Sequence, residues 1–170
     1  MFKYTAADRE KMMEIVTADL RSPNHCSDIV RLLDAYTRDI MGGGESLTEY
    51  TKENLASELA KRDGCIVLLT YVEQEAVALA ICFEGFSTFA CKPILNIHDL
   101  MVDQKYRGQG LCVGLLNRAE SVAKARGCCK MTLEVLEGND RASKIYLEFG
   151  FNPYELNSEM GRAMFYEKKI

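Results

Sequence analysis

A glycine-containing loop carries the residues of this sequence that are best suited to bind a charged ligand. The segment Arg107-Gly108-Gln109-Gly110 follows an apolar run at 94–102 and precedes a helically periodic segment that continues to residue 125. This order predicts strand, turn and helix. Glycines let a ligand approach the main chain, and the first turn of a helix presents N–H groups at the positive end of its dipole. The loop is therefore predicted to bind a diphosphate, with Arg107 as an added cation.

The spacing of the glycines separates this loop from two other phosphate-binding loops. A P-loop ends in Gly-Lys-Ser/Thr, whereas Leu111 follows Gly110 in this sequence. A dinucleotide fingerprint, G-x-G-x-x-G, needs its third glycine one residue before Gly114 and begins directly after a strand. A dinucleotide-binding domain is therefore disfavoured. A plain turn before a core helix is the alternative to a ligand site.

The composition is typical of a globular domain rather than of a nucleic-acid-binding or membrane protein. The 170 residues are 48% hydrophobic and 27% charged, which suffices for a core. The net charge of −4 argues against a nucleic-acid surface, which is normally basic. The sequence contains neither an apolar run of bilayer length nor a secretory signal at its first residues. We therefore expect a cytoplasmic protein without a nucleic-acid or membrane partner.

The cysteines and histidines show no spacing typical of a metal site. The seven cysteines form no C-x-x-C pair, and His25 and His98 are the two histidines. An odd number of cysteines, four of them in apolar segments, favours reduced thiols in a cytosol. The sequence therefore predicts no bound metal.

Hydrophobic periodicity predicts one domain over 13–170, preceded by a lead-in at 1–12. Strands are expected at 13–18, 65–72, 76–83, 94–102, 130–136 and 163–168. Helices are expected at 23–40, 51–62 and 111–125 and from Asn139 or Asp140 to 149, with glycines or caps at their ends. The runs at 65–72 and 76–83 are almost continuously apolar, which indicates a hairpin in a sheet covered on both faces. The element order predicts a mixed α/β fold.

A second motif lies about thirty residues beyond the loop, with Asn139, Ala142 and Tyr146 before Gly150-Phe151. It resembles the Asn-x-x-Ala-x-x-x-Tyr-x-x-x-Gly-Phe segment of the GNAT acetyltransferases. The first loop resembles their acyl-CoA loop, Arg/Gln-x-x-Gly-x-Gly/Ala, with Cys112 replacing the small last residue. Together the matches cover roughly residues 94–152. The resemblance implies the GNAT fold, a central mixed but mostly antiparallel sheet flanked by helices.

Within this superfamily, the chain is most similar to the spermidine/spermine and diamine acetyltransferases. The segment at 26–32 looks like their first helix, and the segment at 97–102 looks like the strand that enters their active site. That subfamily typically has glutamate where this chain has His98.

The resemblance implies transfer of an acetyl group from acetyl-CoA to the primary amine of a small molecule, by direct attack in a ternary complex. Polyamines and diamines are the favoured acceptors, ahead of an amino acid, an aminoglycoside or a protein N-terminus. A non-catalytic acyl-CoA-binding or regulatory module is the alternative. A homodimer is also implied.

The resemblance places the cofactor on the main chain where two strands splay apart, on the glycine loop and on the second motif. The cofactor-binding residues so implied are Leu100, Met101, Val102, Arg107, Gly108, Gln109, Gly110, Leu111, Cys112, Val113, Asn139 and Ala142. Main-chain N–H groups at the splayed strand would polarise the thioester carbonyl. No covalent acyl-enzyme is then needed, and Cys112 and Cys128 are expected to be structural.

The chemistry requires a base and an acid. An alkylamine with a pKa near ~10.4 arrives protonated, and an imidazole with a pKa near ~6.5 is suited to remove the proton. We expect His98 to be this base and Tyr146, a phenol with a pKa near ~10, to protonate the leaving thiolate. The cationic remainder of the amine would pair with Asp39, Asp99 or Glu134. Ordinary packing or solvation is the alternative for each of these side chains.

Overall fold

The computed structural model describes residues 13–155, 157 and 159–170. The predicted lead-in at 1–12 lies outside these described residues. The chain divides between Leu136 and Glu137 into two compact units, and each is described by itself. Within the described part of the chain, no helix has the length and apolar character needed to cross a membrane.

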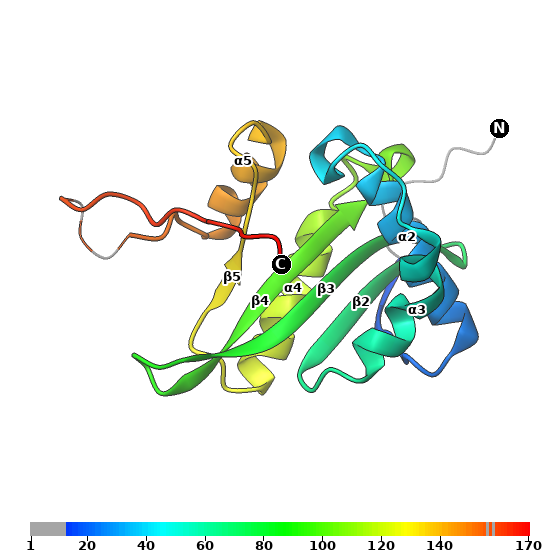
Figure 1. Ribbon diagram of the computed structural model, residues 1–170, viewed down its shortest axis with the longest axis horizontal. Coiled ribbons are helices and arrows are strands. Elements are labelled where there is room, and N and C mark those ends of the chain that lie inside the picture. The colour runs from blue at the N-terminus through cyan, green and yellow to red at the C-terminus, as the bar shows by residue number, and fades with distance from the viewer. Residues whose placement is uncertain (1–12, 156, 158) are drawn as a thin grey trace. The chain divides into compact units, whose positions relative to one another are not determined.

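A five-stranded sheet forms the centre of the first unit (Figure 1). Its strands lie side by side in sequence order: β1 (Met13–Thr17), β2 (Cys65–Val72), β3 (Glu75–Ser87), β4 (Lys92–Val102) and β5 (Met131–Leu133). Neighbouring strands pair antiparallel from β1 to β4, whereas β5 runs parallel to β4. The predicted mixed, mostly antiparallel sheet is thereby confirmed.

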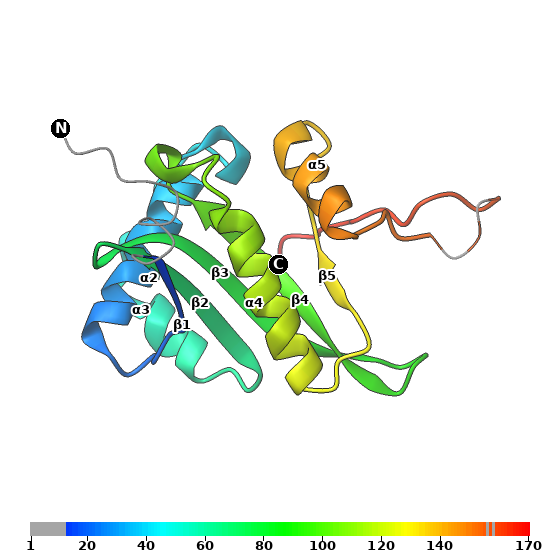
Figure 2. The same ribbon diagram turned by 180° about the vertical axis from the view of Figure 1, so that it is seen from behind.

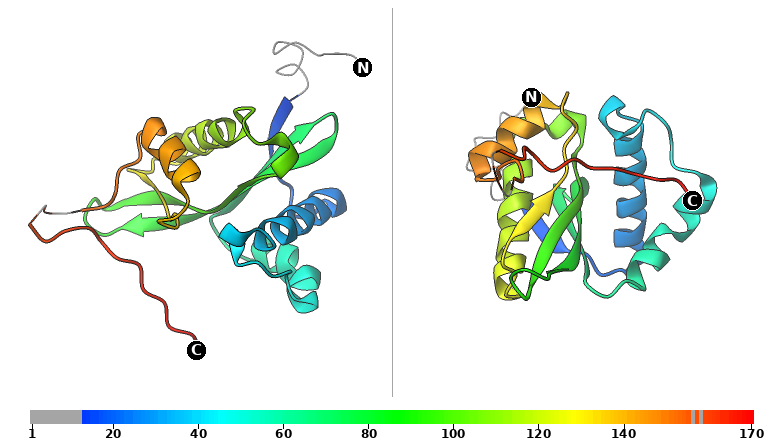
Figure 3. Two further views of the ribbon diagram at one scale, coloured as in Figure 1. Left: turned by 90° about the horizontal axis from the view of Figure 1, so that it is seen from above. Right: turned by 60° about the vertical axis from the view of Figure 1, so that its left-hand side comes forward.

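Helices cover both faces of this sheet. Helices α2 (Pro23–Thr37) and α3 (Glu49–Ala60) lie on one face, and α4 (Leu111–Ala125) crosses the other (Figures 2 and 3). Two short 3₁₀ turns, η1 (Ile40–Gly42) and η2 (Gln104–Tyr106), precede α3 and α4. Coverage on both faces explains why β2 is buried from Ile66 to Thr70 and β3 from Ala76 to Cys82.

The hairpin between β2 and β3 forms as the sequence predicts. Its turn consists of Glu73 and Gln74, with φ angles of 51° and 68°. Positive φ at both central residues matches the twist of a two-residue antiparallel hairpin. The hairpin therefore has the geometry that a short polar linker between two apolar runs favours.

The apolar stripe of α4 faces the sheet as predicted, with Leu111, Leu115 and Ala119 buried. Gly114 belongs to the same contact. A Cβ atom built on Gly114 would lie 3.1 Å from Cδ1 of Ile15 in β1. The third glycine of the loop region therefore lets the helix pack closely on the sheet.

Three boundaries differ from the prediction, and strand pairing decides two of them. Strand β3 continues to Ser87 and β4 begins at Lys92, so most of the expected irregular segment at 85–93 is paired hairpin. Strand β5 is shorter than 130–136, because its pairing with β4 ends at Leu133. Helix α2 ends at Thr37, and the side chain of Ile40 is 83% exposed rather than part of the helical stripe.

The second unit contains helix α5 (Asp140–Phe149). Of the two predicted caps, Asn139 or Asp140, it is Asn139 that caps this helix: its side-chain oxygen accepts a hydrogen bond from the N–H of Ala142 at 3.2 Å. Gly150 ends it with a φ of 109°. The predicted strand at 163–168 is wrong: these residues are exposed and belong to no strand. An apolar pattern alone supplies no partner for the main-chain groups of a strand.

One hydroxyl in the core has no hydrogen-bond partner among the described residues. Thr70 of β2 is fully buried, and its Oγ1 is unsatisfied. Valine has nearly the same shape without the hydroxyl, so Thr70→Val should raise the free energy of unfolding by about 1 kcal/mol. Thermal unfolding should show a melting temperature higher by roughly 2–4 °C. The exposed Thr17→Val is the matched control and should change little. A lower melting temperature for Thr70→Val would show that the hydroxyl is satisfied.

Candidate active site

The glycine loop adopts the strand, turn and helix arrangement expected of it. Gly108 and Gly110 both have left-handed main-chain geometry, with φ angles of 81° and 82°. Helix α4 begins at Leu111, and its first helical hydrogen bond runs from the N–H of Gly114 to the carbonyl of Gly110 at 3.0 Å. Among the described residues, a Cβ atom on Gly110 would meet nothing within 4 Å. The space beside this glycine is therefore open.

The start of α4 has the properties of an anion-binding helix terminus. Gly110 holds the capping position and has no side chain with which to cap the first turn. The N–H groups of the first turn, from Leu111 to Val113, lack acceptors within the helix by geometry. The positive end of the helix dipole lies at the same place. This arrangement suits a phosphate group of a ligand.

The guanidinium of Arg107 is held at two points of the protein. Its Nε donates a hydrogen bond to the carbonyl of Val102 at 3.0 Å, and its Nη2 donates to Oδ2 of Asp39 at 2.8 Å. The hydrogen bond from Arg107 is the main reason that the pKa of Asp39 lies below its ordinary value. The charge of Arg107 is thus already compensated within the protein, so the main-chain N–H groups of α4 are the better-placed partners for an anion.

One edge of β4 beside this loop pairs with no described strand, and we call it the open edge. Pairing of β4 with β5 ends at Ile97 and Leu133, whereas pairing with β3 continues to Val102. The N–H of Asp103 donates to the carbonyl of Val77 in β3 at 2.9 Å. Because main-chain groups alternate between the two edges of a strand, the N–H and C=O of Leu100 point away from β3. No described strand pairs with that side of Leu100.

A β-bulge in β4 sets the position of the predicted base. Asp99 pairs with Ile81 and Ile97 pairs with Cys82, so His98 is the extra residue between two ladder positions. The imidazole of His98 meets the ring of Phe83 edge-on, with ring centroids 5.6 Å apart. Bulges bend a strand and re-aim its side chains. This bulge therefore brings His98 and its neighbour Asp99 together at one point of the sheet.

Asp99 is a partly buried carboxylate to which the described residues donate no hydrogen bond. Burial raises the pKa of Asp99, and the charge of His98 opposes that rise. The pKa of Tyr36 in α2 is also raised, by burial first and then by the charge of Asp99. Phe83 thus lies beside His98, and the carboxylate of Asp99 is close enough to Tyr36 for its charge to act on the phenol. In the sequence, Tyr36 and Phe83 stand out only as members of apolar segments, so the sequence does not predict their place near these two side chains.

The remaining predicted residues lie just after β5 and in the second unit. Glu134 is exposed just beyond the end of β5. Tyr146, Asn139 and Ala142 belong to the second unit. In that unit Tyr146 is buried, and its ring contacts the ring of Phe151 at a centroid distance of 6.0 Å.

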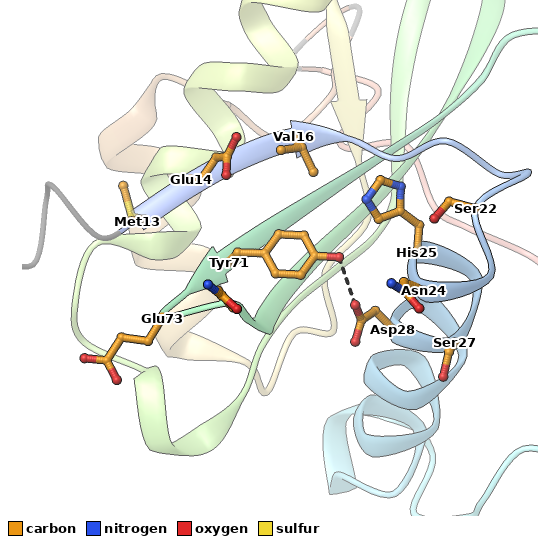
Figure 4. Close-up of a pocket in the computed structure, with 11 residues that line it drawn as sticks. Met13, Glu14, Val16, Ser22, Asn24, His25, Ser27, Asp28, Tyr71 and Glu73 are labelled. Carbon is orange, nitrogen blue, oxygen red and sulfur yellow. Dashed lines mark hydrogen bonds between the residues drawn. The ribbon is translucent and has the colours of Figure 1, made fainter.

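A separate open cleft of about 850 Å³ lies between the first turn of α2, β1 and the β2–β3 turn (Figure 4). Tyr71 donates a hydrogen bond to Asp28 at 2.8 Å within it, and burial followed by this bond raises the pKa of Tyr71 to about 12. Nδ1 of His25 accepts from the N–H of Asp19 at 2.9 Å. None of the predicted site residues lines this cleft. Across the described ranges, no group of three or more His, Cys, Asp or Glu side chains is placed to hold a metal ion.

The chain is similar in sequence to known N-acetyltransferases. The chain is 31% identical over 74 residues to a thialysine N-epsilon-acetyltransferase of Bos taurus, a match that covers 44% of this chain and 43% of that protein. It is 29% identical over 121 residues to an uncharacterized N-acetyltransferase of Archaeoglobus fulgidus, covering 67% of this chain and 82% of that protein. The match thus spans less than half the length of the first relative.

Solved structures show the same fold. An aminoglycoside acetyltransferase from an uncultured soil sample, in complex with sisomicin, superposes with a TM-score of 0.74 at 17% identity, over 94% of this chain and 99% of that one. The model of the Acetyltransferase (GNAT) family matches residues 28–151, which include the bulge, the open edge of β4, the glycine loop and α5. The chain therefore belongs to the GNAT acetyltransferase family.

Proposed function

We propose that the protein is an acetyl-CoA-dependent N-acetyltransferase that acts on the primary amine of a small molecule. The open edge of β4, directly before the anion-binding start of α4, is the observation that carries this proposal. An edge whose main-chain groups pair with no described strand suits an extended amide-containing arm, and a helix terminus suits a diphosphate. Acetyl-CoA combines these two chemical groups, and members of the family use it as co-substrate.

The proposed cofactor contacts divide between main-chain and motif residues. The N–H groups of Leu111 to Val113, approached through Gly108 and Gly110, would bind the diphosphate. The edge from Leu100 to Val102 would pair with the pantetheine arm and polarise the thioester carbonyl. Asn139 and Ala142 are added to this set by the second motif alone.

The amine is proposed to bind beside the bulge in β4, next to His98 and Asp99. Asp99 is our candidate counter-ion for the ammonium group, because no described residue donates a hydrogen bond to its carboxylate and its burial strengthens electrostatic attraction. Asp39, by contrast, is already engaged by Arg107. Aromatic rings of Tyr36 and Phe83 beside a carboxylate suit an alkylammonium group. Polyamines and diamines have this chemistry.

His98 is proposed to take the proton from the amine before the nitrogen attacks the thioester carbonyl. The thiolate then leaves with a proton, for which Tyr146 is the proposed donor. The names of two similar proteins, a thialysine and an aminoglycoside acetyltransferase, are consistent with a small amine acceptor. A homodimer, which sedimentation would test, remains part of the proposal.

The activity is tested by measuring acetyl-CoA consumption with a panel of amines and detecting the products by mass spectrometry. The panel should contain spermidine, putrescine, lysine, thialysine, an aminoglycoside and a peptide with a free N-terminus. Acetylation of at least one amine is expected. Stabilisation by coenzyme A without turnover of any amine would favour a non-catalytic binding module, and stabilisation by NAD alone would refute the assignment.

His98→Ala should lower kcat by roughly 100-fold or more, with the largest loss at neutral pH, because a general base contributes on that scale. The pH–rate profile of each variant measures this effect. His25→Ala is the matched control, because His25 is the other histidine of the sequence and lies in the separate cleft. An unchanged pH–rate profile for His98→Ala would exclude His98 as the base.

Asp99→Asn should weaken amine binding and stabilise the fold. Burial raises the pKa of Asp99 above its ordinary value of 3.8, so the ionised form is disfavoured in the folded protein. Stability is therefore lost as the pH rises from 3.8 through the folded pKa, and asparagine removes that cost at neutral pH.

We expect the KM of Asp99→Asn for the amine to rise about tenfold or more, since a charge-assisted hydrogen bond is lost. Its melting temperature should increase at pH 7, and this gain should vanish in acid. Exposed Asp63→Asn serves as the control. A lower melting temperature at pH 7 together with an unchanged KM would contradict both roles.

A further inference from the structure

The carboxylate of Asp39 joins the connection between α2 and α3 to the glycine loop. Asp39 accepts hydrogen bonds from the N–H of Met41 at 3.1 Å, from Nη2 of Arg107 at 2.8 Å and from Nε2 of Gln104 at 3.4 Å. The first contact caps η1, whereas the other two reach residues far away in the sequence. Asp39 is therefore fixed on its own loop, and from this position it binds Gln104 of η2 and Arg107 of the glycine loop.

Arg107 connects Asp39 to the open edge of β4. Its guanidinium donors form a planar, rigid fork, so holding Nη2 on Asp39 also directs Nε. Nε donates to the carbonyl of Val102, which points to the same edge as the main-chain groups of Leu100. The contacts thus run without a break from Asp39 through Arg107 to the strand edge.

The electrostatic environment favours a persistent contact at neutral pH. The side chain of Asp39 is only 12% exposed and that of Arg107 is 35% exposed, so solvent screens the pair less than it would a surface pair. The hydrogen bond from Arg107 lowers the pKa of Asp39, with the N–H of Met41 as the next contribution. Tyr36 also lies near Asp39 and is a neutral phenol with a raised pKa. The carboxylate therefore stays ionised at neutral pH.

We propose that Asp39 is a positioning residue that holds Arg107 against β4 and so keeps the strand edge and the glycine loop in the geometry that binds coenzyme A. This inference rests on the proposed function. It assigns Asp39 to the cofactor side of the site, rather than to the amine. It also assigns the charge of Arg107 to the carboxylate of Asp39, rather than to a phosphate.

The test measures the dissociation constant of coenzyme A by calorimetry, and kcat and KM for acetyl-CoA, for Asp39→Asn, Arg107→Lys and the double variant. We expect Asp39→Asn to weaken coenzyme A about tenfold and to raise the KM for acetyl-CoA more than it lowers kcat. Because the two residues act through one contact, the double variant should bind coenzyme A no more weakly than the single variant with the lower affinity. Asp39→Glu, which keeps the charge, should restore part of the affinity.

Asp34→Asn is the matched control. Asp34 ties the same connection through Ser46, Leu47 and Arg38 but does not contact the glycine loop. It should lower the melting temperature and leave the affinity for coenzyme A unchanged.

Three results would overturn the inference: an unchanged affinity in Asp39→Asn, an equal loss in Asp34→Asn, or tighter binding in Asp39→Asn. The last would mean that Asp39 merely masks a phosphate-binding cation. If the unaltered protein binds no coenzyme A, the proposed function fails and takes this inference with it. Binding by the unaltered protein with any of the three results rejects the inference alone.

Discussion

Gly110→Val is expected to weaken binding of coenzyme A by roughly 100-fold or more, a loss of about 2.7 kcal/mol. Two physical effects combine. The space beside Gly110 is open, so a branched side chain would fill the approach to the first turn of α4. In addition, the φ of 82° is one that a β-branched residue rarely adopts, so the loop would shift. Calorimetry with coenzyme A measures the loss, and acetyl transfer should fall with it.

Gly127→Val separates the loss of the site from the loss of stability. Gly127 follows the other end of α4, has a φ of 70° and also faces open space. Both variants should therefore lower the melting temperature by a similar amount, because both place a β-branched residue in left-handed geometry. Only Gly110→Val should lose coenzyme A. Undiminished affinity in Gly110→Val, or equal losses in the two variants, would refute the assignment of the loop.

Tyr146→Phe is expected to lower kcat by roughly 100-fold while leaving the affinity for coenzyme A unchanged. The phenol is the proposed donor of the proton that the departing thiolate takes up, and phenylalanine removes that proton without removing the ring. Tyr146 is buried and packs edge-on against Phe151, so the ring that supports α5 would be kept. Steady-state kinetics with the best acceptor of the amine panel, together with calorimetry, measures the two quantities separately.

Tyr166→Phe is the matched control, since Tyr166 is 85% exposed in the C-terminal segment and carries no proposed role. Its kcat should equal that of the unaltered protein. Normal turnover in Tyr146→Phe would remove Tyr146 from the mechanism. A joint loss of turnover and of coenzyme A affinity would instead indicate a structural role for the hydroxyl.

Features that depend on neighbouring residues follow from the sequence alone. Helical spacing of apolar residues predicts α4 with its buried stripe, and a polar linker between two apolar runs predicts the β2–β3 hairpin. The left-handed glycines 108 and 110 and the Asn139 cap are equally local. Each depends on interactions within a few residues, such as first-turn hydrogen bonds, steric limits on φ and the repeat of one element. The order of these elements is enough to predict the mixed sheet covered by helices.

Features that join distant segments are decided only by the tertiary structure. The bulge at His98 exists because the register of β3 and β4 leaves His98 without a residue opposite it. The edge of β4 at Leu100 is open because the pairing of β5 with β4 ends at Leu133. The contact of Arg107 with Asp39 spans 68 positions of the sequence. The segment at 163–168 has a strand-like pattern and forms no strand. Local pattern states which residues prefer burial or extension, whereas pairing register and charge contacts depend on which surfaces the folded chain brings together.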